Sequence, residues 1–205
     1  MTPELEKKFY GSDPVFVLDP EDDRNAANNQ LNTNTLRFWK IYPDYIRDLF
    51  IQSFGKSSVK PPYDRVIEMT WLDAFVKLRS ETVPCPHCGK ETFIAPKYSV
   101  NCMYCGGQLT CTDSIKFKRF ELPAFGGAKL YDGMASDTEG DFHKIIGEVV
   151  RNKKDPSKHA LRNLTQNTWS VKLPDNTVKT VDPNGIMPIN KGFVLTIGRS
   201  EGTVE

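Results

Sequence analysis

The sequence predicts an α+β protein built from three consecutive parts. Residues 1–80 carry helical patterns, residues 81–113 contain two closely spaced cysteine pairs, and residues 114–205 consist of short strand-like runs separated by turn sequences. Hydrophobic residues make up 39% of the 205 residues and charged residues 26%, which is typical of a folded globular protein and argues against extensive disorder.

The first part contains two predicted helices. Over residues 44–54, side chains with the spacing of one helical face are Tyr45, Ile46, Leu49, Phe50, Ser53 and Phe54. Pro43 lies where a first helical turn tolerates proline. The second helix is predicted over residues 65–80, after the breaker-rich segment GKSSVKPPYDR. Its broad apolar side consists of Val66, Met69, Trp71, Leu72, Phe75 and Leu78.

The last part has the sequence pattern of an all-β domain. Its strand-like runs are residues 115–122, 144–150, 169–173, 179–183 and 193–198. The sequences DPSK, PDN, DPNG and NKG separate them and are rich in turn-forming residues. Short strands at this spacing predict a β-sandwich or barrel.

The middle part contains CPHCG and CMYCGG, and 13 residues separate Cys88 from Cys102. Each CxxC pair places two thiolates on one tight turn, so that both can reach the same tetrahedral ion. A glycine after each pair lets the chain fold back over the sulfurs without a Cβ clash. The sequence therefore predicts a zinc ribbon with a structural Zn²⁺ ion. Its ligands are predicted to be Cys85, Cys88, Cys102 and Cys105.

Such a site has no open coordination position, so it holds structure and performs no chemistry. A module this short buries little apolar surface, and we expect the metal to supply much of its folding free energy. The segment FIAPKYSV, residues 93–100, is predicted to form a hairpin that links the two pairs. Redox-active or disulfide-bonded pairs are the alternative, but neither pair begins a helix in a βαβ unit. Cys111 is expected to be a strand residue and His87 to point to solvent, with a Cys₃His site left open.

Charge and cysteine usage restrict location and partners. The formal net charge is +1, which gives no global sign of a nucleic-acid partner. The sequence has no apolar run of membrane-spanning length and no signal peptide at its start. Four of the five cysteines lie in CxxC pairs, which favours a reducing compartment. We expect a cytoplasmic protein that has no contact with a membrane.

The helical part resembles a known family. Residues 9–29, 38–54 and 61–80 are similar to the C-terminal lobe of bacterial serine/threonine kinase-like proteins. These are found with PP2C phosphatases and von Willebrand A proteins, notably in tellurium-resistance-type gene clusters. Arg65 matches an arginine that in the family pairs with a glutamate of the activation segment, and Trp71 lies on the last helix of the lobe. The resemblance continues over nearly the whole chain.

The motifs needed for phosphoryl transfer are missing. The sequence contains no glycine-rich phosphate loop, no VAIK-type lysine, no HRD-type loop and no DFG or APE motif. We therefore expect a non-catalytic segment, the C-terminal portion of a longer kinase-like protein. A helical scaffold unrelated to kinases is the alternative. Taken alone, such a remnant is expected to expose its large aromatic side chains Trp39, Phe50, Phe54 and Trp71, unless they pack on the sandwich or in a dimer.

Residues 144–205 resemble a forkhead-associated (FHA) domain, a β-sandwich whose loops at one end bind phosphothreonine. Ile146–Glu148 occupies the strand that usually carries a Gly-Arg pair, so the phosphate-contacting arginine is replaced. Thr165 is the nearest match to the family's loop serine, and Asn184-Gly185 to its NG turn, although a simple hairpin turn has the same sequence. Gly192 lies at the turn before the predicted closing strand.

The resemblance implies protein partners, including phosphorylated ones, and among them a PP2C phosphatase and a von Willebrand A protein. The residues predicted to contact a phosphopeptide are Arg151, Asn163 and Thr165, helped by Arg162 and Lys158. One alternative is a purely structural sandwich with a solvated basic loop. Another is nucleic-acid binding by the ribbon residues Lys90, Lys97 and Tyr98 and the strand IKFKR, against which the near-zero net charge counts.

Overall fold

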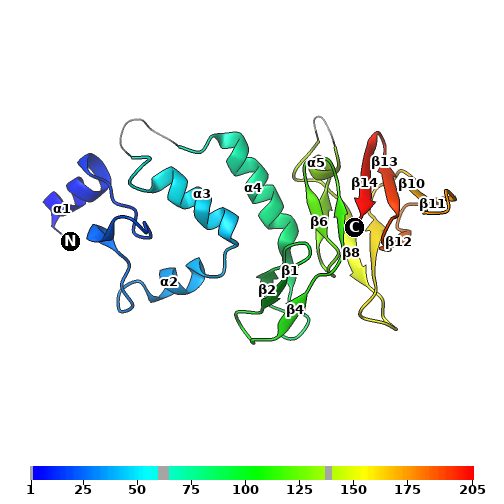
Figure 1. The fold of residues 1–205 in the computed structure, drawn as a ribbon, viewed down its shortest axis with the longest axis horizontal. Helices are drawn as coiled ribbons and strands as arrows, with labels where there is room; N and C mark the ends of the chain where they lie inside the picture. The colour runs from blue at the N-terminus through cyan, green and yellow to red at the C-terminus, as the bar shows by residue number, and fades with distance from the viewer. Residues whose placement is uncertain (1, 60–64, 137–139) are drawn as a thin grey trace. The chain divides into compact units, whose positions relative to one another are not determined.

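The computed structural model describes residues 2–59, 65–136 and 140–205 (Figure 1). The chain forms two compact units, Met1–Phe75 and Val76–Glu205. The boundary between them falls inside helix α4, Glu68–Glu81. The cysteine-rich segment and the strand-rich segment therefore belong to one unit, while the finer division at residues 80 and 113 stays a prediction.

The first unit is helical. Its elements are α1 (Pro3–Lys7), a π-helical turn (Lys8–Ser12), a 3₁₀ turn (Asp23–Asn25), α2 (Thr33–Trp39), α3 (Asp44–Phe54) and the start of α4. The predicted helix over residues 44–54 is confirmed as α3, although Pro43 precedes it as the N-cap. On α3, Ile46 and Ser53 are the buried residues.

The predicted apolar side of α4 is not its buried side. Ala74, Val76 and Ser80 are buried, whereas Met69, Leu72 and Phe75 are between 38% and 54% exposed. Apolar residues occur on several sides of this helix, so periodicity alone did not identify the face that packs. The preceding turn, residues 60–64, lies outside the described residues.

Aromatic side chains of the first unit pack against one another. Phe50 of α3 lies 6.0 Å from Trp39 and 5.0 Å from Trp71, measured between ring centroids in edge-to-face arrangements. Phe54 lies 5.9 Å from Phe50, and Phe16 contacts both Trp39 and Phe54. The expected exposure of these aromatic residues is wrong for Trp39, Phe50 and Trp71, which are half-buried, and holds for Phe54, which is 44% exposed.

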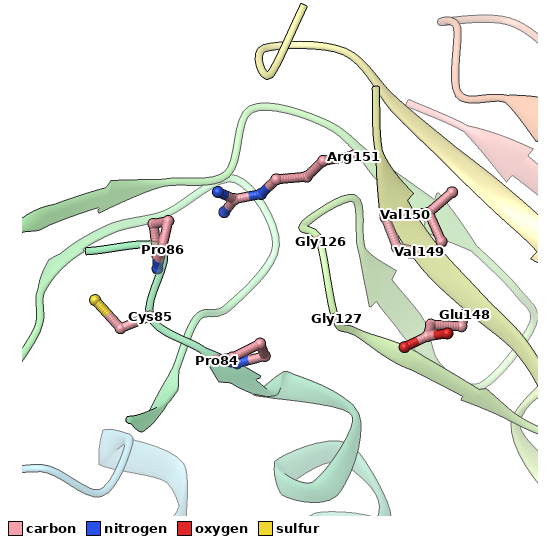
Figure 2. A pocket seen from close by; sticks show the side chains of 9 residues that line it. All are labelled: Pro84, Cys85, Pro86, Gly126, Gly127, Glu148, Val149, Val150 and Arg151. Atoms are coloured by element: carbon pink, nitrogen blue, oxygen red, sulfur yellow. The ribbon is translucent and has the colours of Figure 1, made fainter. Parts of the chain in front are cut away.

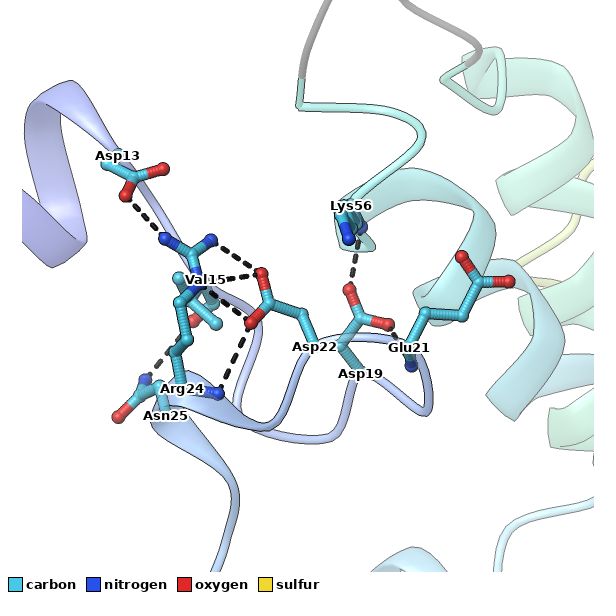
Figure 3. Close-up of polar contacts among 8 residues, drawn as sticks. All are labelled: Asp13, Val15, Asp19, Glu21, Asp22, Arg24, Asn25 and Lys56. Carbon is cyan, nitrogen blue, oxygen red and sulfur yellow. Dashed lines mark hydrogen bonds and ion pairs between the residues drawn. The ribbon is translucent and has the colours of Figure 1, made fainter.

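An arginine organises the polar loop that joins the π-helical turn to α2 (Figure 3). The Arg24 guanidinium donates to Asp13 at 2.6 Å and to both carboxylate oxygens of Asp22. These bonds hold the pKa of Asp22 at about 2, below its ordinary value of 3.8. Asp19 accepts from the backbone N–H of Lys56 just after α3, so the loop is fastened to the helical part of the same unit.

The second unit contains two larger antiparallel sheets. The six-stranded sheet has the order β11-β10-β13-β14-β5-β6 and the four-stranded sheet the order β12-β9-β8-β7. The strands of the first are β5 (Ser114–Lys116), β6 (Glu121–Pro123), β10 (Trp169–Lys172), β11 (Val178–Val181), β13 (Val194–Ile197) and β14 (Ser200–Val204). Those of the second are β7 (Lys129–Tyr131), β8 (Ile145–Arg151), β9 (His159–Asn163) and β12 (Ile186–Pro188), with helix α5 (Asp132–Ala135) after β7.

Both sheets contribute to one hydrophobic core. Buried residues of the six-stranded sheet include Ile115, Leu122, Trp169, Val171 and Leu195, and those of the four-stranded sheet include Leu130, Ile146, Leu161 and Met187. A core shared in this way is the mark of two sheets packed face to face. Four of the five predicted strand runs each contain one strand, whereas the run 115–122 is a hairpin of two strands, β5 and β6. The coarse prediction of short antiparallel strands in this part of the chain is confirmed.

Two details differ from the predictions. The run 193–198 is not the closing strand, because β14 follows it and pairs with β5. The DPNG sequence joins β11 in one sheet to β12 in the other, so it is not a hairpin turn. Asn184 there adopts a left-handed φ of 62°, a conformation that asparagine tolerates better than most residues.

Candidate functional site

Each cysteine pair lies at the tip of its own short hairpin. Strand β1 (Thr82–Pro84) pairs with β2 (Glu91–Phe93) around the first pair, and β3 (Ser99–Asn101) pairs with β4 (Gln108–Thr110) around the second. The prediction that residues 93–100 form one hairpin between the pairs is therefore wrong. The segment is divided between the two hairpins because each CxxC turn already reverses the chain.

The two cysteine turns have the same hydrogen-bond pattern. In the first, the Gly89 N–H donates to Cys85 O at 2.8 Å and the Cys85 N–H to Lys90 O at 2.9 Å. The corresponding bonds of the second turn, to Cys102 O and Gly107 O, measure 2.7 and 2.9 Å. The glycine after each pair has a φ of 71° or 72°, which confirms that glycine is needed there.

The four thiols converge from these turns. Cys85 Sγ lies 3.8 Å from Cys105 Sγ, and Cys88 Sγ lies 3.8 Å from Cys102 Sγ. All four sulfurs are within 4.8 Å of one another, and none forms a disulfide. A tetrahedral ion with metal–sulfur bonds of about 2.3 Å requires sulfur–sulfur separations of about 3.8 Å. The four residues can therefore hold a metal ion, and the prediction that they come together is confirmed.

Ionisation differs among these thiols. Burial opposes ionisation of Cys102, but the N–H groups of Tyr104 and Cys105 favour its thiolate and bring its pKa down to about 7. At Cys105 the Gly107 N–H favours the thiolate, yet burial and the other thiols raise the pKa to about 11. Closely packed thiols repel one another when all of them are ionised. A divalent cation relieves this repulsion, so the four thiols are suitable metal ligands.

His87 and Cys111 lie outside the ligand set. The exposed His87 ring packs against Gly107, where an added Cβ would lie 2.5 Å from His87 Cδ2. Its Nε2 atom is 3.3 Å from Gln108 O. Cys111 is buried and its thiol donates to Asp113 O at 3.2 Å. Both observations favour four cysteine ligands over a Cys₃His set.

The residues predicted to contact a phosphopeptide do not form one site. Arg151 ends β8 and is in register with His159 at the start of β9, close in sequence to Lys158. Thr165 follows the other end of β9. At about 3.3 Å per residue, the five-residue strand separates its two ends by about 13 Å. One phosphate group therefore cannot contact both Arg151 and Thr165.

Three of the five residues are basic and lie in different surroundings. The Arg151 guanidinium carbon lies 4.7 Å from the centroid of the Phe125 ring. Lys158 pairs with Asp155 at 3.3 Å in the exposed β8–β9 connection. Arg162 is exposed on β9, in register with Glu148 of β8. The structure therefore does not bring any two of these three cationic side chains together beside Thr165.

Asn163 is wholly buried and shapes the loop after β9. Its side-chain amide donates to Asn167 O at 2.8 Å and to Val181 O at 3.0 Å. Its carbonyl oxygen accepts from the backbone N–H and the hydroxyl of Thr165, at 2.9 and 2.7 Å. With its polar atoms used inside the protein, Asn163 positions Thr165 and has no direct access to a ligand.

A cavity of about 800 Å³ opens beside Thr165. Its charged lining residues are Asp132, Lys144 and Arg199, and its polar ones include Thr165, Asn167, Thr168 and Ser200. The loop after β9, the β13–β14 turn and the residues before β8 thus meet at one place. Sequence reasoning missed Lys144 and Arg199, because they belong to no motif and only the strand pairing brings them to Thr165.

Two lysines considered for nucleic-acid binding have contacts within the protein. Lys97 pairs with Glu205 at 2.7 Å and with Glu121 at 3.6 Å. The Lys90 ammonium lies 4.7 Å from the centroid of the Tyr104 ring. Tyr98 is 61% exposed. The carboxylates of Glu205 and Glu121 beside Lys97 weaken the attraction of the ribbon surface for nucleic-acid phosphates.

No protein-family model, curated protein or solved structure matches this chain. Within residues 2–59, 65–136 and 140–205, no helix is both long and apolar enough to cross a membrane. Arg65, which the kinase resemblance singles out, is exposed before α4, and Trp71 belongs to the aromatic cluster of the first unit.

Proposed function

We propose that this chain is a non-catalytic recognition segment of a bacterial serine/threonine kinase-like protein, and that a structural Zn²⁺ ion stabilises it. The observation that carries the metal part is the closed set of four thiols with tetrahedral separations. Cys85, Cys88, Cys102 and Cys105 would fill the coordination shell and leave no position for a substrate. The ion would supply folding free energy, in line with a ribbon built from strands of three residues.

The recognition part rests on the cavity beside Thr165. Lys144 and Arg199 are two cationic residues of the lining, which also contains the carboxylate of Asp132 and the hydroxyl groups of Thr168 and Ser200. A phosphothreonine dianion needs convergent donors of this kind, and arginine offers them as a fork. The buried Asn163 holds the loop in shape before any ligand arrives, which lowers the entropy lost on binding.

The kinase link rests on the resemblance of the helical unit. A segment of this kind would bring partners of a phosphorylation system, such as a PP2C phosphatase or a von Willebrand A protein, to an associated kinase. Its cytoplasmic location belongs to the same proposal. The missing phosphate loop, catalytic base and metal-binding motifs of kinases support the proposal that the segment is not catalytic.

Fluorescence anisotropy tests the recognition role. The zinc-loaded chain is titrated with a degenerate phosphothreonine peptide pool and with its unphosphorylated twin. We expect preference for the phosphorylated pool, weakened roughly tenfold or more by Arg199→Ala, since a hydrogen bond to a charged group contributes about 1.5–3 kcal/mol.

Arg162→Ala is the matched control, because it removes an exposed arginine from β9 and leaves the cavity lining unchanged. Equal binding of the two peptide pools would contradict phosphothreonine recognition. Loss of binding in Arg151→Ala but not in Arg199→Ala would move the site to the opposite end of β9.

A further inference from the structure

The first cysteine turn packs against the strand-rich part of its own unit at two adjacent glycines. A Cβ added to Gly127 would lie 2.4 Å from Pro84 Cδ, and one added to Gly126 would lie 2.5 Å from Arg151 Cγ. Gly127 also has a φ of 98°. Because both positions are glycine, β1 and the Arg151 side chain can both pack closely against the Gly126–Gly127 turn.

Arg151 extends from strand β8 towards the first cysteine turn. It lines a cavity of about 340 Å³ together with Pro84, Cys85 and Pro86 of the cysteine turn. Figure 2 shows its side chain leaving β8 and extending towards Pro86 and Cys85, while Glu148 lies on the far side of the Gly126–Gly127 turn. The guanidinium also covers the Phe125 ring, so the side chain is held on one face by an aromatic surface.

A half-buried guanidinium is stabilised by a negative charge nearby. Among the residues that the structure describes, no carboxylate forms an ion pair with Arg151. Cys85 lines the same cavity as Arg151 on the side towards which the guanidinium extends, whereas Glu148, which also lines the cavity, lies beyond the Gly126–Gly127 turn (Figure 2). The negative group that faces this cation is therefore the sulfur cluster.

Charge counting strengthens the link. Four thiolates carry four negative charges and a divalent ion two positive ones, so the loaded centre has a formal charge of −2. Such a centre is partly buried here, since Cys85 and Cys102 are each 2% exposed. Buried charge requires nearby compensation, and the groups around a metal tune its affinity.

We propose that Arg151 is the charge-compensating residue of the metal centre, and that it couples metal binding to the packing of β8 against the cysteine turn. This assignment rests on the proposed zinc site and is independent of phosphopeptide recognition. It also gives a role to Arg151, which ends β8 beside the start of β9 and is remote from Thr165.

Competition between the full-length chain and a chromogenic chelator tests the assignment. Arg151→Met keeps the aliphatic stem and removes the charge, Arg151→Lys keeps the charge and loses the planar fork, and Arg162→Met is the control on β9. We expect Arg151→Met to bind Zn²⁺ roughly tenfold more weakly, as loss of an outer-shell partner typically does. Arg151→Lys should recover most of the affinity, and Arg162→Met should match the unmodified chain.

Co²⁺ substitution gives a second readout. The sulfur-to-cobalt charge-transfer band should shift in Arg151→Met and stay close to its original energy in Arg151→Lys, because the charge near Cys85 changes only in the first.

Zinc affinity of Arg151→Met equal to that of the unmodified chain would overturn the proposal, as would equal weakening in the Met and Lys variants. If Arg151→Met fails to fold, an Arg151→Lys variant that folds and retains the metal supports the charge role. A Lys variant that also fails overturns it. A chain that binds neither metal would refute the zinc site itself, whereas normal zinc binding with no effect at Arg151 would refute only this inference.

Discussion

Cys85 and Cys105 belong to different hairpins, yet their sulfur atoms lie 3.8 Å apart. The same separation joins Cys88 to Cys102. Each hairpin contributes one buried and one exposed cysteine to the cluster. Neither CxxC turn can form the cluster alone. The two hairpins must therefore fold together, and a bound ion would hold them in this arrangement.

Substitution of Asn163 should destabilise the second unit and disturb the loop at Thr165. Asn163→Ala removes hydrogen bonds to Asn167, Val181 and Thr165 from a fully buried position. We expect a loss of about 3 kcal/mol in the free energy of unfolding, measured by urea denaturation with zinc in excess. Asn190→Ala, at an exposed position, should change it by less than about 0.5 kcal/mol. Similar values for both variants would show that Asn163 is not a structural anchor.

Gly127 and Gly198 offer a comparison of strain with crowding. Both have a left-handed φ, 98° and 60°, but an added Cβ meets Pro84 only at Gly127 and open space at Gly198. Gly198→Ala should cost about 1 kcal/mol from backbone strain. Gly127→Ala should cost about 2 kcal/mol more, because β1 must move away. Thermal unfolding monitored by circular dichroism measures both, and equal losses would contradict the close packing of the cysteine turn on Gly127.

The Asp22–Arg24 pair makes the first unit sensitive to acid. Because the folded-state pKa of Asp22 is lowered from 3.8 to about 2, its contribution to stability is complete above about pH 4 and disappears as the pH falls through 2. A titration followed by the carboxyl ¹³C shift should have its midpoint near 2. In Arg24→Gln the midpoint should return towards 3.8. An ordinary midpoint in the unmodified chain would show that the guanidinium does not hold this carboxylate in solution.

Local sequence signals were sufficient where structure is decided locally. The CxxC-Gly turns could be predicted because each needs only five adjacent residues, and the strands of the second unit because their apolar runs lie between turn sequences. Even so, the same local reasoning placed a hairpin at residues 93–100, since it could not tell which strands pair.

Features that depend on pairing between distant strands were beyond prediction. The sequence suggested that Arg151 and Thr165 belong to one site, but they lie beside opposite ends of β9. Lys144 and Arg199, which are distant in sequence, line one cavity. The sequence around a basic loop residue does not indicate which residues it will contact. Those contacts depend on how the distant strands pair. For the same reason, the sequence suggested a phosphate for Arg151 and gave no hint that it lines one cavity with Cys85.

Hydrogen exchange of the full chain, with and without a zinc chelator, tests the central claim most directly when zinc content is followed by native mass spectrometry. We expect one zinc ion per chain. The backbone amides of β1–β4 should be protected and lose protection once the ion is removed, while α3 keeps its protection. Unchanged protection of β1–β4 after complete removal of the ion, or a chain that never carries one, would contradict a structural metal centre.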